Sequence, residues 1–272
     1  MPDQVCVTGG FDDLRAPHVR FLEEASRLGE LTVLLWPDDA LREMTGRPPK
    51  FSAAERLYFL NALRYVSRVV LVRGPIHPDE LPEAPGYSPS VWVVGGCRHS
   101  PARQAFARAR GIQYRVLDGV ACSGYPSPPP TPALPGRKKV IVTGCYDWLH
   151  TGHIRFFEEA STYGDLYVGL GNDANIEALK GPGHPLIKQD ERRYMVGSIR
   201  YVKHAFISSG SGLLDADPEI RQLRPDLYVV NEDGDRGGKR EYCQQLGIEY
   251  RVLKRVPAPG LPARSSTELR GF

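Results

Sequence analysis

Thr143-Gly-Cys-Tyr-Asp-Trp-Leu-His150-Thr-Gly-His153 is the stretch that decides how this chain folds. It follows an apolar run, Lys139-Val-Ile-Val142, that is typical of a buried strand. It leads into Ile154-Arg-Phe-Phe-Glu-Glu-Ala-Ser161, whose apolar residues recur with the period of a helix. The sequence therefore predicts two histidines, three residues apart, where a parallel strand passes into the first turn of a helix.

This position suits the binding of a phosphate group. The first turn of a helix has free backbone N–H groups and a positive potential, and both favour an anion. Two imidazole rings there can donate hydrogen bonds to a phosphoryl group that gains charge in a transition state. A partial zinc site is the alternative interpretation of His150 and His153, but no cysteine or histidine at a suitable spacing is obvious nearby.

With the strand before it and Gly152 between the histidines, the segment resembles the His-x-Gly-His signature of the cytidylyltransferase-like branch of the nucleotidyltransferase superfamily. The resemblance covers residues 137–272. It implies an α/β domain of the Rossmann-like kind. It also implies a reaction in which an acceptor phosphate attacks the α-phosphorus of a nucleoside triphosphate and pyrophosphate leaves.

The resemblance also implies a set of site residues. The implied catalytic residues are His150, His153 and Lys180. The implied nucleotide-binding residues are Thr143, Gly144, Cys145, Tyr146, Asp147, Gly152, Asn231, Asp233, Ser265, Ser266 and Thr267. Three arginines, Arg192, Arg200 and Arg264, are implied to bind substrate or phosphate. Mg²⁺ is the implied cofactor, and its ligands are left open.

Several of these residues have a simpler alternative role. Arg192 and Arg200 lie on a helix predicted over 189–202, where they can converge on one anion or face solvent. Asp147 can cap its own turn through a side-chain hydrogen bond. Asn231 stands where the family has a glycine, so the identity of the base stays open. The acidic loop around Asp233 can also be merely solvated.

The C-terminal motif departs from the family pattern. Arg264-Ser-Ser-Thr-Glu-Leu269 resembles the Ser/Thr-rich segment that opens the last helix of the family and holds the β- and γ-phosphates. The Arg-Thr-x-Gly that usually precedes it is absent, and Gly260-Leu-Pro-Ala263 stands in its place. Arg264 is the candidate to supply the missing charge. An ordinary helix N-cap is the alternative role of Ser265.

The chain contains an internal repeat. Val19-Arg-Phe-Leu-Glu-Glu-Ala-Ser26 answers Ile154-Arg-Phe-Phe-Glu-Glu-Ala-Ser161, an offset of 154 − 19 = 135. Gly111-Ile-Gln-Tyr-Arg-Val-Leu117 answers Gly247-Ile-Glu-Tyr-Arg-Val-Leu253, an offset of 247 − 111 = 136, so one residue is inserted near Gly183. Each copy alternates strands with helices, which predicts a mainly parallel sheet.

The repeat predicts three segments and one architecture. They are a degenerate nucleotidyltransferase-like domain at 1–124, a proline-rich linker at 125–136 and a catalytic domain at 137–272. In the second copy the predicted strands are 139–143, 165–170, 204–208, 226–230 and 248–253, and the predicted helices are 151–163, 189–202 and 236–246. We expect tandem Rossmann-like domains packed as an intramolecular pseudo-dimer, because related single-domain enzymes are homodimers. A higher oligomer stays open.

The first copy has lost most of the polar groups of a phosphate site. Arg15 stands for His150, Pro17 for Gly152 and Thr45 for Lys180, whereas His18 matches His153. The first copy is therefore predicted to be a partner domain without catalytic activity. Regulatory binding of an anion by Arg15 and His18 stays open.

Composition narrows the class of protein. The chain has 272 residues, 41% hydrophobic and 25% charged, which is typical of a soluble globular protein. The net charge of +3 is too small to indicate nucleic-acid binding. No apolar run reaches the length of a membrane span, and the N-terminus does not resemble a signal peptide. Five widely spaced cysteines fit a reduced, cytoplasmic protein.

The expected partners are a nucleoside triphosphate and a phosphorylated small molecule. The tandem layout and the turn at Gly144 resemble the ethanolamine-phosphate cytidylyltransferases, which favours transfer of CMP from CTP to a phosphorylated alcohol or polyol. The loop Lys180-Gly-Pro-Gly-His-Pro185 equally resembles the adenylyltransferases that activate heptose phosphate, so ATP with a sugar phosphate is the alternative. An alternative of another class is a non-catalytic nucleotide-binding regulator, although such a protein need not keep both histidines.

Overall fold

The structure is a computed structural model that describes residues 3–119, 121–127 and 136–269. Contacts between residues divide the chain into two compact units, Met1–Tyr125 and Pro126–Phe272. The division falls at the start of the linker predicted over 125–136. Among the described residues, no helix is long and apolar enough to pass through a bilayer.

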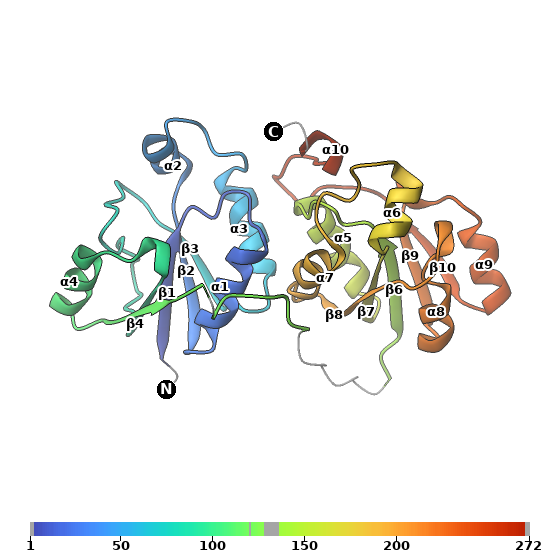
Figure 1. The fold of residues 1–272 in the computed structure, drawn as a ribbon, viewed down its shortest axis with the longest axis horizontal. Coiled ribbons are helices and arrows are strands. Elements are labelled where there is room, and N and C mark those ends of the chain that lie inside the picture. Colours follow the sequence, from blue (N-terminus) through green and yellow to red (C-terminus); the bar gives the residue numbers. More distant parts are fainter. Residues whose placement is uncertain (1–2, 120, 128–135, 270–272) are drawn as a thin grey trace. The chain divides into compact units, whose positions relative to one another are not determined.

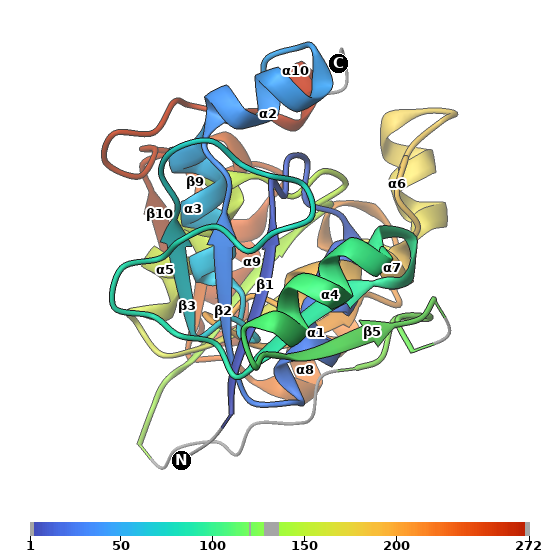
Figure 2. The ribbon, with the colours of Figure 1, turned by 90° about the vertical axis from the view of Figure 1, so that its left-hand side faces the viewer.

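The first unit is a five-stranded parallel sheet with helices between the strands. Its strands are β1 (Gln4–Gly9), β2 (Glu30–Leu35), β3 (Arg68–Leu71), β4 (Val91–Gly95) and β5 (Gln113–Leu117). Its helices are α1 (Ala16–Ser26), α2 (Asp38–Thr45), α3 (Ala53–Ala62), η1 (Gly96–Arg98) and α4 (Pro101–Ala109). The strand order is β3-β2-β1-β4-β5, and Figure 2 shows β1, β2 and β3 side by side with α4 to the right of them in this view.

The second unit repeats this arrangement (Figure 1). Its strands are β6 (Lys139–Gly144), β7 (Asp165–Leu170), β8 (Val202–Ile207), β9 (Leu227–Asn231) and β10 (Glu249–Leu253). Its helices are α5 (Thr151–Ser161), α6 (Asp173–Lys180), α7 (Gln189–Gly197), η2 (Gly212–Leu214), α8 (Asp217–Leu223), η3 (Glu232–Gly234), α9 (Lys239–Leu246) and α10 (Ser266–Leu269). The strand order β10-β9-β6-β7-β8 confirms the predicted tandem Rossmann-like fold.

This topology places the histidine segment at the functional edge of the second sheet. Strand β6 is central and pairs in parallel with β7 on one side and β9 on the other. The order of the strands reverses between β6 and β9, and ligands of open parallel sheets bind at the carboxyl ends of the strands at such a point. The turn that follows Gly144 leaves the sheet there.

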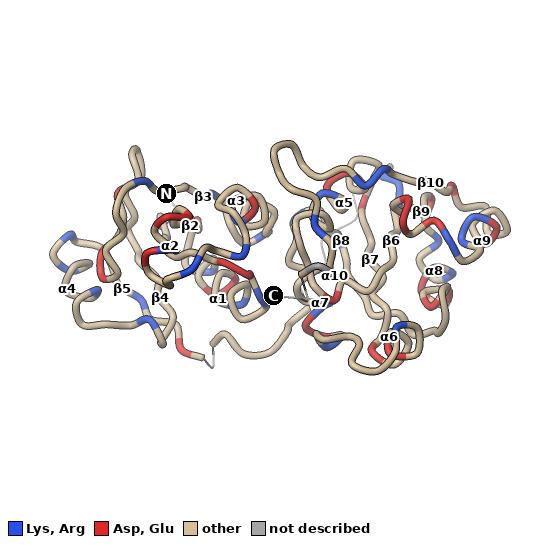
Figure 3. The backbone as a smooth tube through the Cα atoms, turned by 90° about the horizontal axis from the view of Figure 1, so that it is seen from above, with Lys and Arg blue, Asp and Glu red and all other residues tan. Residues whose placement is uncertain are grey.

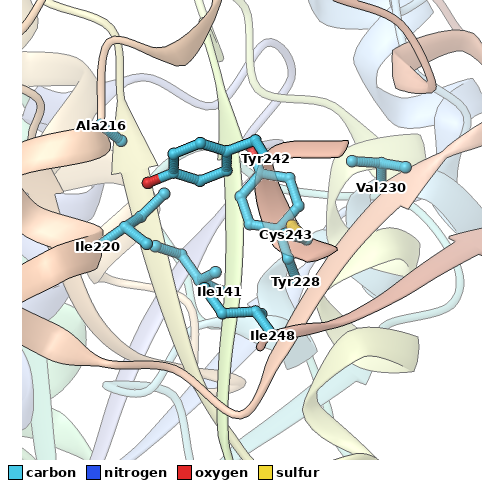
Figure 4. Packing of buried hydrophobic residues seen from close by; sticks show 8 residues of the cluster. All are labelled: Ile141, Ala216, Ile220, Tyr228, Val230, Tyr242, Cys243 and Ile248. Carbon is cyan, nitrogen blue, oxygen red and sulfur yellow. The ribbon is translucent and has the colours of Figure 1, made fainter. Parts of the chain in front are cut away.

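A buried apolar cluster packs strands β6 and β9 against helices α8 and α9. Figure 4 shows Ile141 of β6 and Tyr228 of β9 packed against side chains of α8 and α9, among them Ile220 and Tyr242. Ile141 is completely buried, and Tyr228 is 2% exposed. Burying such side chains stabilises the fold by about 1.5–3 kcal/mol each, so the central strands form a rigid base for the site.

All three predicted helices are shorter in the structure, and the one predicted over 151–163 ends at Ser161. The helix predicted over 189–202 ends at Gly197, and the chain then turns into β8. The helix predicted over 236–246 begins at Lys239, because Gly237 and Gly238 both have positive φ angles, 75° and 71°, outside the helical range. Helix α8 was not predicted, since its seven residues are too few for a clear period.

Charged residues of both signs are interspersed along both units (Figure 3). Many of them form pairs within one helix, such as Arg155 with Glu159 at 2.6 Å in α5. Exposed pairs of this kind contribute little to stability, about 0.3–0.5 kcal/mol each. All five cysteines are free thiols. Burial raises the pKa of the Cys243 thiol to about 11, so this thiol stays protonated and unreactive at neutral pH.

Candidate active site

The first histidine caps the helix that it precedes. His150 is the N-cap of α5, and its Nδ1 atom accepts a hydrogen bond of 3.1 Å from the backbone N–H of Gly152. Because Nδ1 is the acceptor, a neutral ring carries its proton on Nε2. The side chain is 2% exposed. The cap therefore fixes both the orientation of the ring and the atom that can donate to a ligand.

The second histidine stacks on the first. The ring centroids of His150 and His153 are 3.9 Å apart with an interplanar angle of 30°. A Cβ atom on Gly152 would lie 2.9 Å from Cε1 of His150, closer than real Cβ atoms approach. The glycine between the two histidines is thus required by the packing of the ring. In the first unit the equivalent position is Pro17.

The turn before the helix supports the ring pair from the other side. Tyr146 has a positive φ of 51° and packs edge-on against His153, with ring centroids 5.3 Å apart. A Cβ atom on Gly144 would lie 2.8 Å from Cζ of Tyr146. Gly144 and Tyr146, both predicted to bind nucleotide, therefore hold the shape of the turn in this structure.

The environment of His153 keeps its ring neutral. Burial lowers the pKa of His153 well below the ordinary value of 6.5, and the nearby charges of His150, Arg255 and Lys180 lower it further. A hydrogen bond to the backbone of Trp148 opposes this shift only in part. At neutral pH the ring is thus an uncharged hydrogen-bond donor, surrounded by positive groups.

This shift predicts a dependence of stability on pH. Below about pH 6.5 the unfolded chain takes up a proton at His153 that the folded chain resists, so stability is present above that pH and falls as pH drops towards the folded pKa. The loss is expected to reach at most about 1.4 kcal/mol per pH unit. Urea unfolding at pH 7.5 and 5.5 measures it. His153→Gln, which cannot titrate, should show the smaller difference, and an equal difference in both proteins would contradict this assignment.

A basic cavity of about 180 Å³ adjoins the N-terminus of α5. Four of the predicted site residues line it, Gly152, Asn231, Arg264 and Ser265. Three basic residues that were not predicted also line it, Arg155, Lys254 and Arg255. The remaining lining residues are Phe156, Glu159, Val256, Pro257 and Ala263. Arg155 and Arg255 are ion-paired with Glu159 and Asp233, so Lys254 and Arg264 give the cavity its net positive charge, which favours an anion.

Arg255 connects the parts of this cavity. Its Nη1 donates to Oδ2 of Asp233 at 2.7 Å, and its Nη2 donates to the carbonyl oxygen of Arg264 at 2.8 Å. Its charge also lowers the pKa of His153. The sequence contains a signal for these basic residues. Lys254 and Arg255 follow the last strand, whereas the first copy has Asp118-Gly119 at the offset of 136.

The structure argues against the phosphate-binding role predicted for Arg192. Its guanidinium is fully buried, and it donates to the carbonyl oxygens of Ile187 at 2.9 Å, Cys145 at 2.7 Å and Gly171 at 2.8 Å. It also pairs with Asp173 at 2.8 Å. These partners accept hydrogen bonds from all three nitrogens of its guanidinium. Arg192 is therefore a clamp between the turn at residues 144–147, here called the phosphate turn, and α6.

The first unit contains the same clamp without the histidine pair. Arg56 donates to the carbonyl oxygens of Phe51 at 3.0 Å, Gly10 at 2.6 Å and Trp36 at 2.9 Å, and pairs with Asp38 at 2.6 Å. Since the first copy lacks the other polar groups of the site, this arginine serves the fold in both units.

Arg200 lies at the wrong edge of the sheet for its predicted role. It is exposed and stands in the turn just before β8 begins at Val202. The strands are parallel, so the turn before β8 lies at the amino edge, opposite the carboxyl edge that carries His150. The prediction failed because the helix that was to carry Arg200 ends at Gly197.

Three more of the predicted residues, Asp147, Thr143 and Ser266, form hydrogen bonds within the second unit. Asp147 is 2% exposed, and its Oδ1 accepts a 2.8 Å hydrogen bond from the N–H of Ile187, which favours its alternative structural role. Thr143 Oγ1 lies 2.5 Å from the hydroxyl of Tyr228. Ser266 Oγ donates to the carbonyl oxygen of Trp148 at 3.3 Å, and the side chain of Thr267 lies outside the described residues.

The residues present do not form a cage for Mg²⁺. Within the described ranges, no group of three or more His, Cys, Asp or Glu side chains is arranged to hold a metal ion. The carboxylate of Asp233 pairs with Arg255, and that of Asp147 accepts from the backbone. Mg²⁺ commonly binds through substrate phosphates, so it stays a prediction, and we derive no chemical step through it.

Comparisons with known proteins find similarity to part of this chain. Residues 141–271 match the family model described as Cytidylyltransferase-like. The bifunctional protein HldE of Aliarcobacter butzleri (strain RM4018) is 34% identical over 122 residues, 44% of this chain and 25% of that protein. HldE of Campylobacter curvus (strain 525.92) is 37% identical over 123 residues, again 44% of this chain and 25% of that protein. The chain thus spans about a quarter of the length of these curated relatives.

A solved structure is also similar to part of the chain. The lipopolysaccharide core biosynthesis protein from Thermoplasma volcanium GSS1 is 21% identical, and the similarity covers 45% of this chain and 99% of that chain with a TM-score of 0.38. A score this low carries no argument about the site.

Proposed function

We propose that this chain transfers a nucleotidyl group from a nucleoside triphosphate to a phosphorylated small molecule, because residues 141–271 match the Cytidylyltransferase-like family model. The observation that carries the proposal is the pair of stacked imidazoles at the N-terminus of α5, next to a basic cavity. Imidazole donors and a helix N-terminus favour a phosphate that gains charge during reaction.

The residues then have distinct tasks in the reaction. An oxygen of the acceptor phosphate attacks the α-phosphorus of the triphosphate, the bond from that phosphorus to the bridging oxygen breaks, and pyrophosphate leaves with the electron pair. His150 and His153 donate to the non-bridging oxygens of the α-phosphate. Lys180 and Arg255, whose charges both act on His153, stabilise the leaving pyrophosphate. No covalent intermediate with the protein is formed, and positioning supplies much of the rate.

The second unit is the catalytic one in this proposal. In the first unit, Arg15 at the position of His150 is paired with Asp13 at 3.1 Å, and Lys50 lies 3.4 Å from the same carboxylate. The carboxylate of Asp13 thus offsets part of the positive charge of Arg15 and Lys50. This pairing supports a silent first unit over a second nucleotide site.

CTP is the proposed donor, with a phosphorylated alcohol or polyol as acceptor. The turn at Gly144-Cys-Tyr-Asp147 and the tandem layout support this choice. ATP with a sugar phosphate is the second candidate, because the loop at 180–185 resembles that of the adenylyltransferases and Asn231 replaces the glycine of the family pattern. A pocket that pairs with the edge of one base leaves buried polar groups unpaired with the other, so selectivity should be sharp.

A side-by-side assay of pyrophosphate release tests the proposal. We expect turnover with CTP to exceed turnover with ATP by about 10²-fold or more across a panel of phospho-alcohols and sugar phosphates. Uncharged alcohols should not react, because the acceptor supplies the attacking phosphate oxygen. Faster turnover with ATP would reject the cytidylyl assignment, and no release with any pair would favour a non-catalytic nucleotide-binding protein.

A further inference from the structure

Helix α6, which ends at Lys180, is joined to a neighbouring loop by the side-chain amides of Asn172 and Asn175, of which Asn175 is buried. Asn175 is 6% exposed. Its Nδ2 donates to the carbonyl oxygen of Gly212 at 3.1 Å and to Oδ2 of Asp215 at 3.0 Å, and its Oδ1 accepts from the N–H of Gly212 at 2.7 Å. Ser208 Oγ donates to the same Asp215 oxygen at 2.6 Å. Helix α6 and the loop 208–215 are therefore joined by a satisfied polar network.

The N-cap of α6 extends this network. Asn172 Oδ1 accepts from the N–H of Asn175 at 2.8 Å. Its Nδ2 donates to the carbonyl oxygens of Ser208 and Gly210, each at 3.0 Å. Two hydrogen-bonding amides, three residues apart, thus set the direction in which α6 leaves the sheet, and the last residue of the helix is Lys180.

The first unit shows that the fold does not need this network. Helix α2 has the same length of eight residues as α6, but Pro37 is its N-cap and Ala40 stands where α6 has Asn175. Val72 stands where the second unit has Ser208. The N–H of Val72 donates to the carbonyl oxygen of Leu35 in β2, as the N–H of Ser208 donates to that of Leu170 in β7. The helix forms all the same.

The network and the lysine are absent from the same copy. Position 45, which answers Lys180, is a threonine, whereas the clamp of Arg192 with Asp173 recurs as Arg56 with Asp38. Interactions that the fold requires are thus present in both units. The amides occur only in the unit that has the lysine and the histidine pair.

We propose that Asn175 is a positioning residue that acts through α6 on Lys180, holding its ammonium group where the β- and γ-phosphates bind. This inference rests on the proposed function for the role of Lys180. The charge of Lys180 already reaches the site, since it lowers the pKa of His153. A lysine has a flexible stem and no fixed direction of its own, so the helix end that carries it must be placed accurately.

A double-mutant cycle on the full chain tests this inference. The affinity for inorganic tripolyphosphate is measured by calorimetry for wild type, Asn175→Ala, Lys180→Ala and the double variant. We expect Asn175→Ala to weaken binding about tenfold when Lys180 is present and to have no further effect when it is absent. A merely structural asparagine would weaken binding equally in both backgrounds, and that result would overturn the inference.

Controls separate this outcome from a general loss of stability. Ser198→Ala removes one buried hydrogen bond, to the carbonyl oxygen of Tyr194 at 2.8 Å, and should bind tripolyphosphate like wild type. Where Asn175→Ala fails to fold, Ser208→Ala loosens the same network and takes its place in the cycle. No tripolyphosphate binding by wild type overturns the inference. Binding that follows the cycle without pyrophosphate release from any substrate pair refutes only the proposed function.

Discussion

Alanine at His150 or at His153 is expected to reduce turnover by about 10² or more while the protein stays folded. This is the scale for losing one preorganised donor to a transition-state oxyanion. His150→Ala also removes the cap of α5, which costs about 1 kcal/mol of stability, so its unfolding curve must be measured beside its turnover. Pyrophosphate release at saturating substrates gives the turnover.

The first unit provides the matched control for this experiment. Arg15→Ala and His18→Ala alter the equivalent positions and should leave turnover near the wild-type value. A folded Arg15→Ala variant without activity, together with an active His150→Ala variant, would move the active site to the first unit.

The second large effect is expected on stability. Arg192→Ala removes the donor from three backbone carbonyl oxygens and from Asp173, and we expect it to lower the free energy of unfolding by about 3 kcal/mol or more. Urea unfolding measures the change. Arg200→Ala, at an exposed turn, should stay within about 0.5 kcal/mol of wild type.

The kinetic constants of the two arginine variants test the same assignment. If Arg192→Ala folds with wild-type stability and shows a raised KM for the phosphorylated acceptor, the guanidinium binds substrate after all and the clamp is not its main role. Arg200→Ala should leave both kcat and KM unchanged.

The sequence predicted the fold because local and repeated signals agreed. The strand before Thr143, the helix after His153 and the offset of 135 residues all indicated the same βα unit, and the strand order confirmed it. The prediction that the two units pack as a pseudo-dimer stays a prediction.

The site was predicted less completely, since a motif names residues but not their partners. The resemblance implied a phosphate-binding role for Arg192, whereas the carbonyl oxygens that surround it belong to backbone distant in the sequence. Arg200 was placed by extending a helix past Gly197, and helix ends are hard to fix from periodicity. Arg255 was not predicted because it lies between the last strand and the Ser/Thr-rich segment, outside the motifs that carry the resemblance.

One tether found in both units has a consequence for how this family of domains can diversify. Asp147 binds the N–H of Ile187, and Asp12 in the first unit binds the N–H of Phe51, the equivalent residue. The residue that makes the offset change from 135 to 136 lies near Gly183, in the loop between α6 and α7 whose end this bond holds at Ile187. The loop can therefore change length while its anchor and the phosphate turn keep their places. Under the proposed function, insertions there would offer a route to new acceptors that leaves the histidine pair in place, both for natural variation and for a designer who grafts loops.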